Sequence, residues 1–172
     1  MKKLICERAG EIIKNKGTLE KALDIKITSR GKEIFIDGLP LEEYEAEKVI
    51  DAINFGFKAD IALQIKEREL AFEIMHIKKF TTRTNLESVR ARVIGTKGKT
   101  LKTFMELTNC FIEVRNNDIG IIGNPESMKA TQVAIISLIK GSKQASVYKY
   151  LEKHHVQPVF DLGLKEVRKK KE

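Results

Sequence analysis

The segment Gly95-Thr96-Lys97-Gly98 has the spacing with the clearest chemical meaning in this sequence, because two glycines bracket a hydroxyl and an amine. A backbone that turns sharply and brings its N–H groups against an anion leaves no room for a Cβ, which favours glycine at both ends. The lysine supplies a countercharge, and the positive end of a following helix adds to it. The segment therefore predicts a cradle for a phosphate group.

Basic residues gather around this loop. The whole chain carries 32 basic and 24 acidic residues, a net charge of +8, and such a surplus favours a polyanionic partner. Residues 1–60 are balanced, with 11 basic and 12 acidic side chains. Between 78 and 102 the only acidic residue is Glu87, and the basic residues there are Lys78, Lys79, Arg83, Arg90, Arg92, Lys97, Lys99 and Lys102.

A nucleotide-binding P-loop is the competing interpretation, because Gly98-Lys99-Thr100 matches the end of that motif. The motif also needs a glycine five residues before Gly98, where this chain has Val93. A valine side chain would obstruct the tight loop around the phosphates. The sequence thus argues against a nucleotide hydrolase that uses Lys99 and Thr100, an activity that would predict stabilisation by nucleotide and magnesium.

The loop belongs to the second of two similar halves. Residues 88–98 align with residues 7–17, and both stretches end in Lys-Gly after an apolar pair. Further along, the segments 119–123 and 34–38 correspond, and a helical stretch closes each half, at Gly141 and at Gly56. The same order of signals in both halves predicts an internal duplication, with the boundary in a linker between about 57 and 70.

Each half reads as a small α+β unit. Helical spacing is found over 46–53 and 101–105, and Asn124 with Pro125 predicts the start of a last helix that Gly141 ends. Alternating and β-branched runs predict strands, which lie at 25–28, 34–36, 70–77, 111–115 and 119–122. The second half then has the order strand, helix, glycine loop, helix, strand, strand, helix.

This order and the stretch from Val93 to Leu101 resemble the KH domain, in which a GXXG loop clamps the backbone of about four nucleotides. More narrowly, the two tandem copies, Gly-Lys-Thr after the loop, and the segments 121–124 and 138–143 leading into Val147-Tyr148 resemble the partner-of-Nob-one family. The resemblance covers roughly residues 1–152. It implies an α+β fold of two tandem type I KH domains (β-α-α-β-β-α), the first with a degenerate loop.

We expect residues 1–62 to form a degenerate KH domain without GXXG, residues 63–155 a KH domain with an intact loop, and residues 156–172 a flexible basic tail. The first copy has Lys14-Asn15-Lys16-Gly17, with lysine in place of the first loop glycine. It is expected to bind RNA weakly, or to act as a brace and protein-contact surface.

The resemblance also places a bound strand between the glycine loop and residues 111–115. Gly95 to Gly98 would hold the sugar-phosphate chain, and basic side chains would contact phosphates: Arg90, Arg92, Lys97, Lys99 and Lys102. An apolar floor is expected from Val93, Ile94, Leu101, Ile112 and Val114. With aromatic residues at 6% and no tryptophan, stacking platforms of the RRM or OB kind are not expected.

By family analogy, the expected function is noncatalytic binding of single-stranded ribosomal RNA, at the 3′ region of the small-subunit RNA, during subunit assembly and 3′-end processing. The implied protein partners are the Nob-one endonuclease and the alpha subunit of initiation factor two. A different class of function stays open, a KH-fold adaptor that docks proteins and binds RNA weakly. Recovery of crosslinked RNA from cells distinguishes the two.

Catalytic, metal and membrane signals are not found in the sequence. His76, His154 and His155 have no carboxylate or cysteine at metal-ligand spacing, and two cysteines, Cys6 and Cys110, form neither a disulfide framework nor a zinc site. We expect no cofactor and no catalysis. No run approaches the roughly 20 apolar residues of a membrane span, and the N-terminus lacks a signal sequence, so the chain is expected in the cytoplasm.

Overall fold

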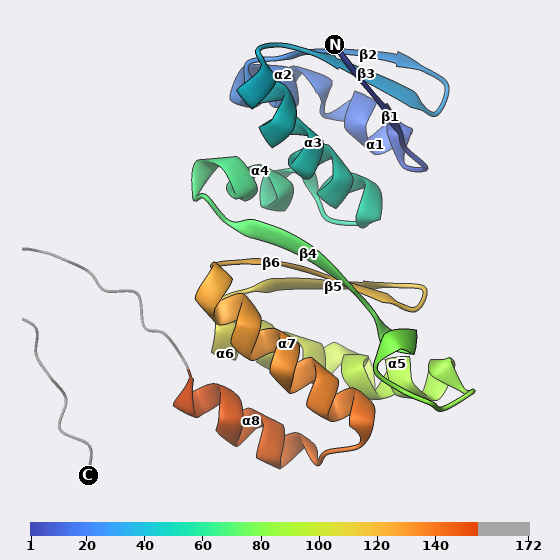
Figure 1. Cartoon of the computed structure of the whole chain (residues 1–172), viewed down its shortest axis with the longest axis vertical. Helices are drawn as coiled ribbons and strands as arrows, with labels where there is room; N and C mark the ends of the chain where they lie inside the picture. The colour runs from blue at the N-terminus through green and yellow to red at the C-terminus, as the bar shows by residue number, and fades with distance from the viewer. Residues whose placement is uncertain (155–172) are drawn as a thin grey trace, which may run out of the picture.

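The computed structural model describes residues 1–154 and confirms the α+β prediction. Two units are stacked one above the other, and each has a three-stranded antiparallel sheet with helices against one face (Figure 1). The strand order is β1-β3-β2 in the first unit and β4-β6-β5 in the second. The two units therefore share one topology, as the internal duplication predicts.

The first unit follows the β-α-α-β-β-α order, and its elements are β1 (Lys2–Ile5), α1 (Ala9–Lys14), α2 (Lys16–Leu23), β2 (Lys26–Arg30), β3 (Glu33–Asp37) and α3 (Pro40–Phe55). The second unit repeats it with β4 (Ala71–His76), α5 (Leu86–Ile94), α6 (Lys99–Thr108), β5 (Phe111–Arg115), β6 (Asp118–Gly123) and α7 (Pro125–Lys140). The last three elements of the two units begin 85 residues apart: at 26 and 111, 33 and 118, and 40 and 125.

Local signals account for the boundaries of α7. The Asn124 side chain accepts a hydrogen bond from the Glu126 N–H, and Pro125 occupies the first helical position, where its missing N–H costs nothing. Gly141 ends the helix with a φ of 111°. The predicted start and end of this helix are confirmed.

Two helices lie outside the predicted KH order: α4 (Ala59–Glu67) and α8 (Gln144–Lys153). The expected boundary between residues 62 and 63 falls inside α4, whose buried Ala62, Leu63 and Ile65 belong to the first core. The passage from one unit to the other therefore lies after α4, just before β4. Residues 156–172, the expected basic tail, lie outside the described part of the chain.

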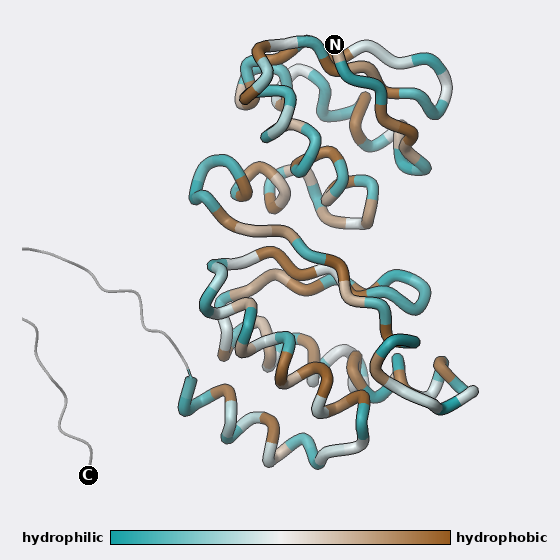
Figure 2. Tube along the Cα trace, in the orientation of Figure 1, coloured by the Kyte–Doolittle hydropathy of each residue, from teal (hydrophilic) through white to brown (hydrophobic). Residues whose placement is uncertain are grey.

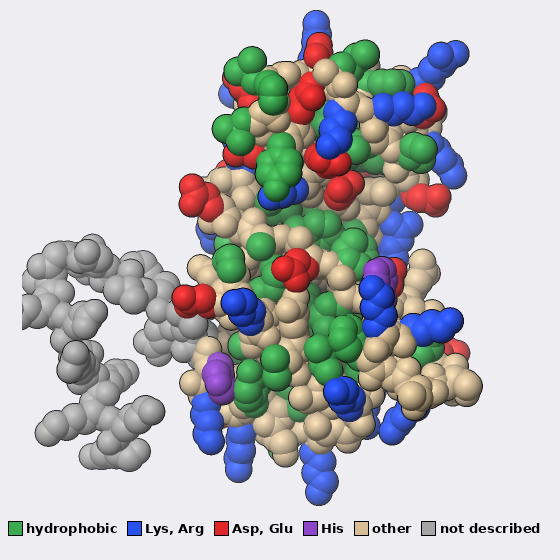
Figure 3. All heavy atoms as spheres, viewed as in Figure 1, with side chains coloured by type: hydrophobic (Ala, Val, Ile, Leu, Met, Phe, Trp, Pro, Cys, Tyr) green, Lys and Arg blue, Asp and Glu red, His purple; other side chains and the backbone are tan. Residues whose placement is uncertain are grey.

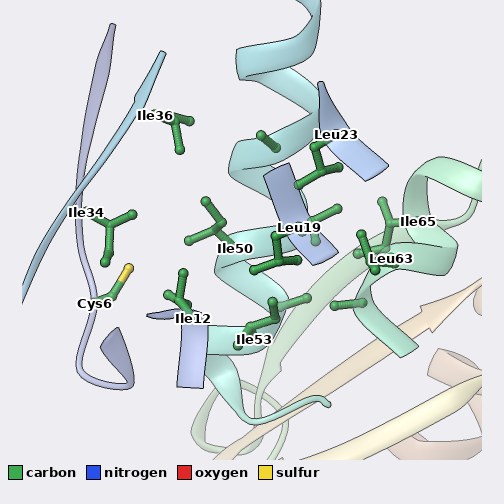
Figure 4. Packing of buried hydrophobic residues seen from close by; sticks show 14 of the residues in the cluster. Cys6, Ile12, Leu19, Leu23, Ile34, Ile36, Ile50, Ile53, Leu63 and Ile65 are labelled. Carbon is green, nitrogen blue, oxygen red and sulfur yellow. The ribbon is translucent and has the colours of Figure 1, made fainter. Parts of the chain in front are cut away.

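Each unit has its own hydrophobic core between sheet and helices. Figure 2 shows brown, apolar segments in the strands and helices of both units. In the first core, Ile34 and Ile36 of β3 point toward Ile12 of α1 and Ile50 of α3 (Figure 4). These four side chains have no exposed surface. The second core is built the same way, with Val93, Phe104, Ile119 and Ile121 among its buried members.

The opposite face of the second sheet is covered by the first unit. Because side chains alternate along a strand, Phe111 and Arg115 of β5 face away from the second core. The ring of Phe72 in β4 packs edge-on against those of Phe55, the last residue of α3, and Phe57, two residues further on (ring centroids 6.2 and 5.9 Å apart). The second sheet thus contacts protein on both faces, and the two units are packed together directly.

Candidate nucleic-acid interface

The GXXG loop forms a single turn between α5 and α6. Helix α5 stops at Ile94, Thr96 to Gly98 make one 3₁₀ turn, and α6 starts at Lys99. The turn holds three residues at positive φ: Gly95 at 77°, Lys97 at 53° and Gly98 at 72°. Two of them are glycines, which adopt this region with little steric cost. The predicted sharp bend is therefore where the sequence placed it.

Gly95 is fixed sterically by Thr100. A Cβ on Gly95 would lie 2.2 Å from the Thr100 Oγ1 and 2.8 Å from the Thr100 backbone N, so no larger residue fits without moving the start of α6. The Thr100 hydroxyl also accepts a hydrogen bond from the Gln144 amide at 2.9 Å. Helix α8, through Gln144, thereby supports the loop from behind.

The loop exposes hydrogen-bond donors and positive charge. Thr96, Lys97 and Lys99 are solvent-exposed. The N–H groups of Gly95 and Gly98 donate to carbonyls at Ala91 and Gly95, whereas those of Thr96 and Lys97 have no acceptor among the described residues. The positive end of α6 follows directly, so two unpaired amides and two lysines bring together donors and positive charge of the kind that binds anions in proteins.

The corresponding position of the first unit has a different backbone. Helix α1 ends at Lys14 and α2 begins at Lys16, so Asn15 alone joins them, and Gly17 lies inside α2. The Asn15 side chain donates to the Glu11 carbonyl. Between α1 and α2 of the first unit, the chain therefore forms no turn like the one between α5 and α6.

The ion pairs of the described residues are unevenly distributed. Seven ion pairs join side chains or the N-terminus within the first unit and α4, among them Met1–Glu43, Lys2–Glu47 and Lys66–Glu45. Among residues 68–154 the one recorded pair is His76–Asp118. The lysines of the GXXG loop are therefore not neutralised by nearby carboxylates within the described chain, and their field is available to an external anion.

The predicted apolar floor needs correction. Val93 has no exposed surface and Ile112 is 3% exposed, because both side chains fill the second core between sheet and helices. A ligand reaches neither of them in this arrangement. Ile94, Leu101 and Val114 are half-buried, so part of each of these side chains is open to solvent.

The two arginines of α5 are engaged inside the protein. Arg90 donates to the Asn116 carbonyl in the β5–β6 turn at 3.1 Å. Arg92 donates to the carbonyls of Gly141 at 2.9 Å and Ser142 at 2.6 Å, which fastens the turn between α7 and α8. Their guanidinium groups hold structure in place, so phosphate contact would rely on their remaining N–H donors. Sequence reasoning had no signal for these long-range bonds.

The structure also bears on the P-loop interpretation. A P-loop uses its Ser or Thr hydroxyl on magnesium and its lysine on the phosphates. Here the Thr100 side chain is buried, and its hydroxyl is packed between Gly95 and Gln144. The hydroxyl at the motif position is therefore not available to a metal ion, which argues against nucleotide hydrolysis.

His76, Cys6 and Cys110 have structural surroundings rather than those of a reactive site. His76 contacts Asp118 at 2.6 Å across paired strands. Burial raises the pKa of the Cys110 thiol and raises that of Cys6 to about 11. Within residues 1–154, no three His, Cys, Asp or Glu side chains converge as metal ligands, and no helix is long and apolar enough to span a bilayer.

Comparison with known proteins identifies the family. The family model for the second KH domain of PNO1, a eukaryotic-type KH domain (KH-domain type I), matches residues 71–156. A KH domain-containing protein of Methanocaldococcus jannaschii is 30% identical over 163 residues, which cover 86% of this chain and 70% of that protein. The chain belongs to the PNO1 family of KH-domain ribosome-biogenesis proteins. The predicted family and its type I KH fold are thus confirmed.

More distant PNO1 relatives and solved structures agree. The pre-rRNA-processing protein pno1 of Emericella nidulans is 26% identical over 113 residues, covering 63% of this chain and 44% of that protein. The crystal structure of Dim2p from Pyrococcus horikoshii superposes with a TM-score of 0.80 at 28% identity, over 88% of this chain and 98% of that one. The Dim2p chain in a complex with a/eIF2alpha and rRNA, also from P. horikoshii, gives 0.80 at 28% identity, over 90% and 93%.

Proposed function

We propose that this chain binds single-stranded RNA through the GXXG loop of its second KH unit, and that the RNA is the 3′ region of small-subunit ribosomal RNA. The observation that carries the proposal is the pair of unpaired amides at Thr96 and Lys97, flanked by exposed lysines. The Pyrococcus horikoshii relative that was solved with rRNA supports the class of ligand. The relatives that act in pre-rRNA processing support the pathway.

The proposed contacts follow from the geometry. The amides of Thr96 and Lys97 donate to phosphate oxygens, while Lys97, Lys99 and Lys102 add long-range attraction. Bases then lie toward β5, over the half-buried Ile94, Leu101 and Val114. Nothing in this arrangement requires bond-making chemistry, so the proposed role is to hold RNA for another factor. A processing endonuclease of the Nob-one type remains the expected partner.

A second candidate role, protein docking, is favoured by the first unit. Large apolar side chains are exposed there: Ile5 at 72%, Leu39 at 66%, Leu41 at 68% and Tyr44 at 54%. Green patches on the upper part of Figure 3 show apolar side chains at the surface of this unit. The alpha subunit of initiation factor two is the proposed partner, supported by the complex of the P. horikoshii relative with a/eIF2alpha.

The test is a pair of matched double substitutions. Thr96→Asp with Lys97→Asp places two carboxylates at exposed positions, so folding is expected to stay intact while RNA affinity falls at least tenfold through repulsion of phosphate. Asn15→Asp with Lys16→Asp makes the same change in charge in the first unit. Affinity for a short RNA from the 3′ end of the small-subunit RNA is measured against a scrambled control.

The control pair needs a stability check, because Asn15 donates to the Glu11 carbonyl and Lys16 pairs with Glu20. Thermal melting of both variants separates lost folding from lost binding. Equal loss of affinity in two folded variants would refute the division of labour between the units. An unchanged affinity in the Thr96/Lys97 variant would refute the RNA site itself.

A further inference from the structure

A second basic surface lies behind the GXXG loop, at the turn between α7 and α8. The turn, residues 140–144, carries the exposed Lys140 and Lys143. Two guanidinium groups lie over Gly141: a Cβ built there would be 3.5 Å from the Arg83 Nη2 and 3.9 Å from the Arg92 Nη1. We name Arg83, Lys140 and Lys143 the turn patch.

The turn patch is continuous with the loop. Gln144 donates to the Thr100 hydroxyl, and that hydroxyl touches the position a Gly95 side chain would occupy. Arg92, in the last turn of α5, donates to the Gly141 and Ser142 carbonyls. One layer of contacts therefore joins the turn to the loop, and an RNA that leaves the loop on this side meets the turn next.

Acidic residues are missing from this end of the unit. Between residues 77 and 105 only Glu87 is acidic, and between 127 and 151 none is. Arg83, Lys140 and Lys143 take part in none of the ion pairs recorded within residues 1–154. The lower edge of Figure 3, around α8, shows blue side chains without red ones between them. The patch keeps its charge for an external partner.

We propose that the turn patch binds the phosphate backbone of double-stranded RNA that continues from the strand held by the GXXG loop, an inference that rests on the proposed function. Surfaces for single strands combine a basic groove with aromatic stacking residues. The turn, Lys140-Gly141-Ser142-Lys143-Gln144, has neither an aromatic residue nor an apolar side chain. Exposed cations on a turn suit recognition of a duplex through its phosphates and shape.

The experiment compares three RNAs and three double variants. The short RNA is a single-stranded hexanucleotide from the 3′ end of small-subunit ribosomal RNA, and the long RNAs continue it at the 5′ or the 3′ end into a hairpin. Lys140→Glu with Lys143→Glu reverses the patch. Lys58→Glu with Lys129→Glu makes the same change in charge at exposed positions elsewhere, Lys129 lying roughly 16 Å along α7 from Lys140.

The patch variant is expected to weaken binding of one hairpin RNA at least tenfold and to lower its salt slope by about 1 to 2, while affinity for the hexanucleotide changes less than twofold. The control variant is expected to change none of these values by more than about twofold. If the patch variant and the control behave alike on both hairpin RNAs, or if the hexanucleotide weakens as much as the hairpin RNA, the inference is wrong. An unchanged RNA affinity would leave an acidic protein as the partner of the patch.

Failure of the proposed function gives a different result. The Thr96→Asp/Lys97→Asp variant is measured on the same RNAs, and it must weaken the hexanucleotide for the loop site to stand. Loss of hairpin binding in the patch variant alone, with no effect of the loop variant on the hexanucleotide, would refute the loop site. Thermal melting of all variants shows that the exposed substitutions leave the fold intact.

Discussion

Replacing Gly95 by alanine is expected to distort the GXXG loop far more than the same change at Gly98. Gly95 has φ 77° and ψ 173°, a region that is essentially restricted to glycine and costs other residues about 1–3 kcal/mol. The new Cβ would also lie 2.2 Å from the Thr100 Oγ1, and forcing extra volume into a packed site costs about 1–3 kcal/mol more. The sum is roughly 4 kcal/mol.

Gly98→Ala provides the control within the same turn. Gly98 lies in the left-handed region, at φ 72° and ψ 13°, and a Cβ there meets nothing within 4 Å. Only the backbone preference is lost, which costs about 1–2 kcal/mol. For a chain of this size each kcal/mol lowers Tm by about 2–4 °C, so Gly95→Ala is expected to lose roughly 8–16 °C and Gly98→Ala roughly 2–8 °C.

Thermal melting of the two variants, followed by circular dichroism, checks this difference in Tm. Affinity for the hexanucleotide reports whether the GXXG loop keeps its conformation. Gly95→Ala is expected to weaken RNA binding at least tenfold even below its Tm, because relief of the contact moves Thr100 and the start of α6. Equal melting temperatures for the two variants would show that the Thr100 contact yields without cost. That result would refute the argument that Thr100 fixes the loop.

Two further predictions concern the rest of the molecule. A Cβ added at Gly120 would lie 2.7 Å from the Phe55 ring, so Gly120→Val is expected to lower Tm by about 4–8 °C and to broaden or split the urea unfolding transition. An unchanged single transition would show that the interface between the units adapts. Burial raises the pKa of Cys6 from 9.0 to about 11, so the folded state holds the thiol proton more tightly than the unfolded state. The free energy of unfolding is then expected to fall as pH rises from about 9 to about 11, and to fall more in the parent protein than in Cys6→Ala. If the urea midpoints of the two proteins change equally over that range, the prediction is wrong.

The sequence predicted the duplicated α+β fold because its signals were local. Asn124, Pro125 and Gly141 define α7 through caps and backbone preference alone, and the strands show in alternating apolar residues. Helix α4 was not predicted, because its short apolar stretch gains stability from packing on the first core. Helix α8 likewise depends on tertiary contacts, such as the packing of Tyr148 on Phe104.

The site was predicted only in part, for the same reason. Glycines that need positive φ are visible in a sequence, and the structure places Gly95 and Gly98 at such positions in the turn between α5 and α6. The burial of Val93 and Ile112 and the carbonyl partners of Arg90 and Arg92 depend on residues 26 to 50 positions away or on the opposite side of a core. The spacing of residues along the chain does not predict such contacts.

The single-residue joint at Asn15 limits how the first unit can be engineered. Only Asn15 separates α1 from α2. Substituting Lys14 by glycine would therefore restore the GXXG sequence but not the backbone conformation of the loop. A graft would need inserted residues that open a gap between the two helices. A GXXG loop in the first unit therefore requires additional residues between α1 and α2. Substitutions that keep the chain length the same do not create one.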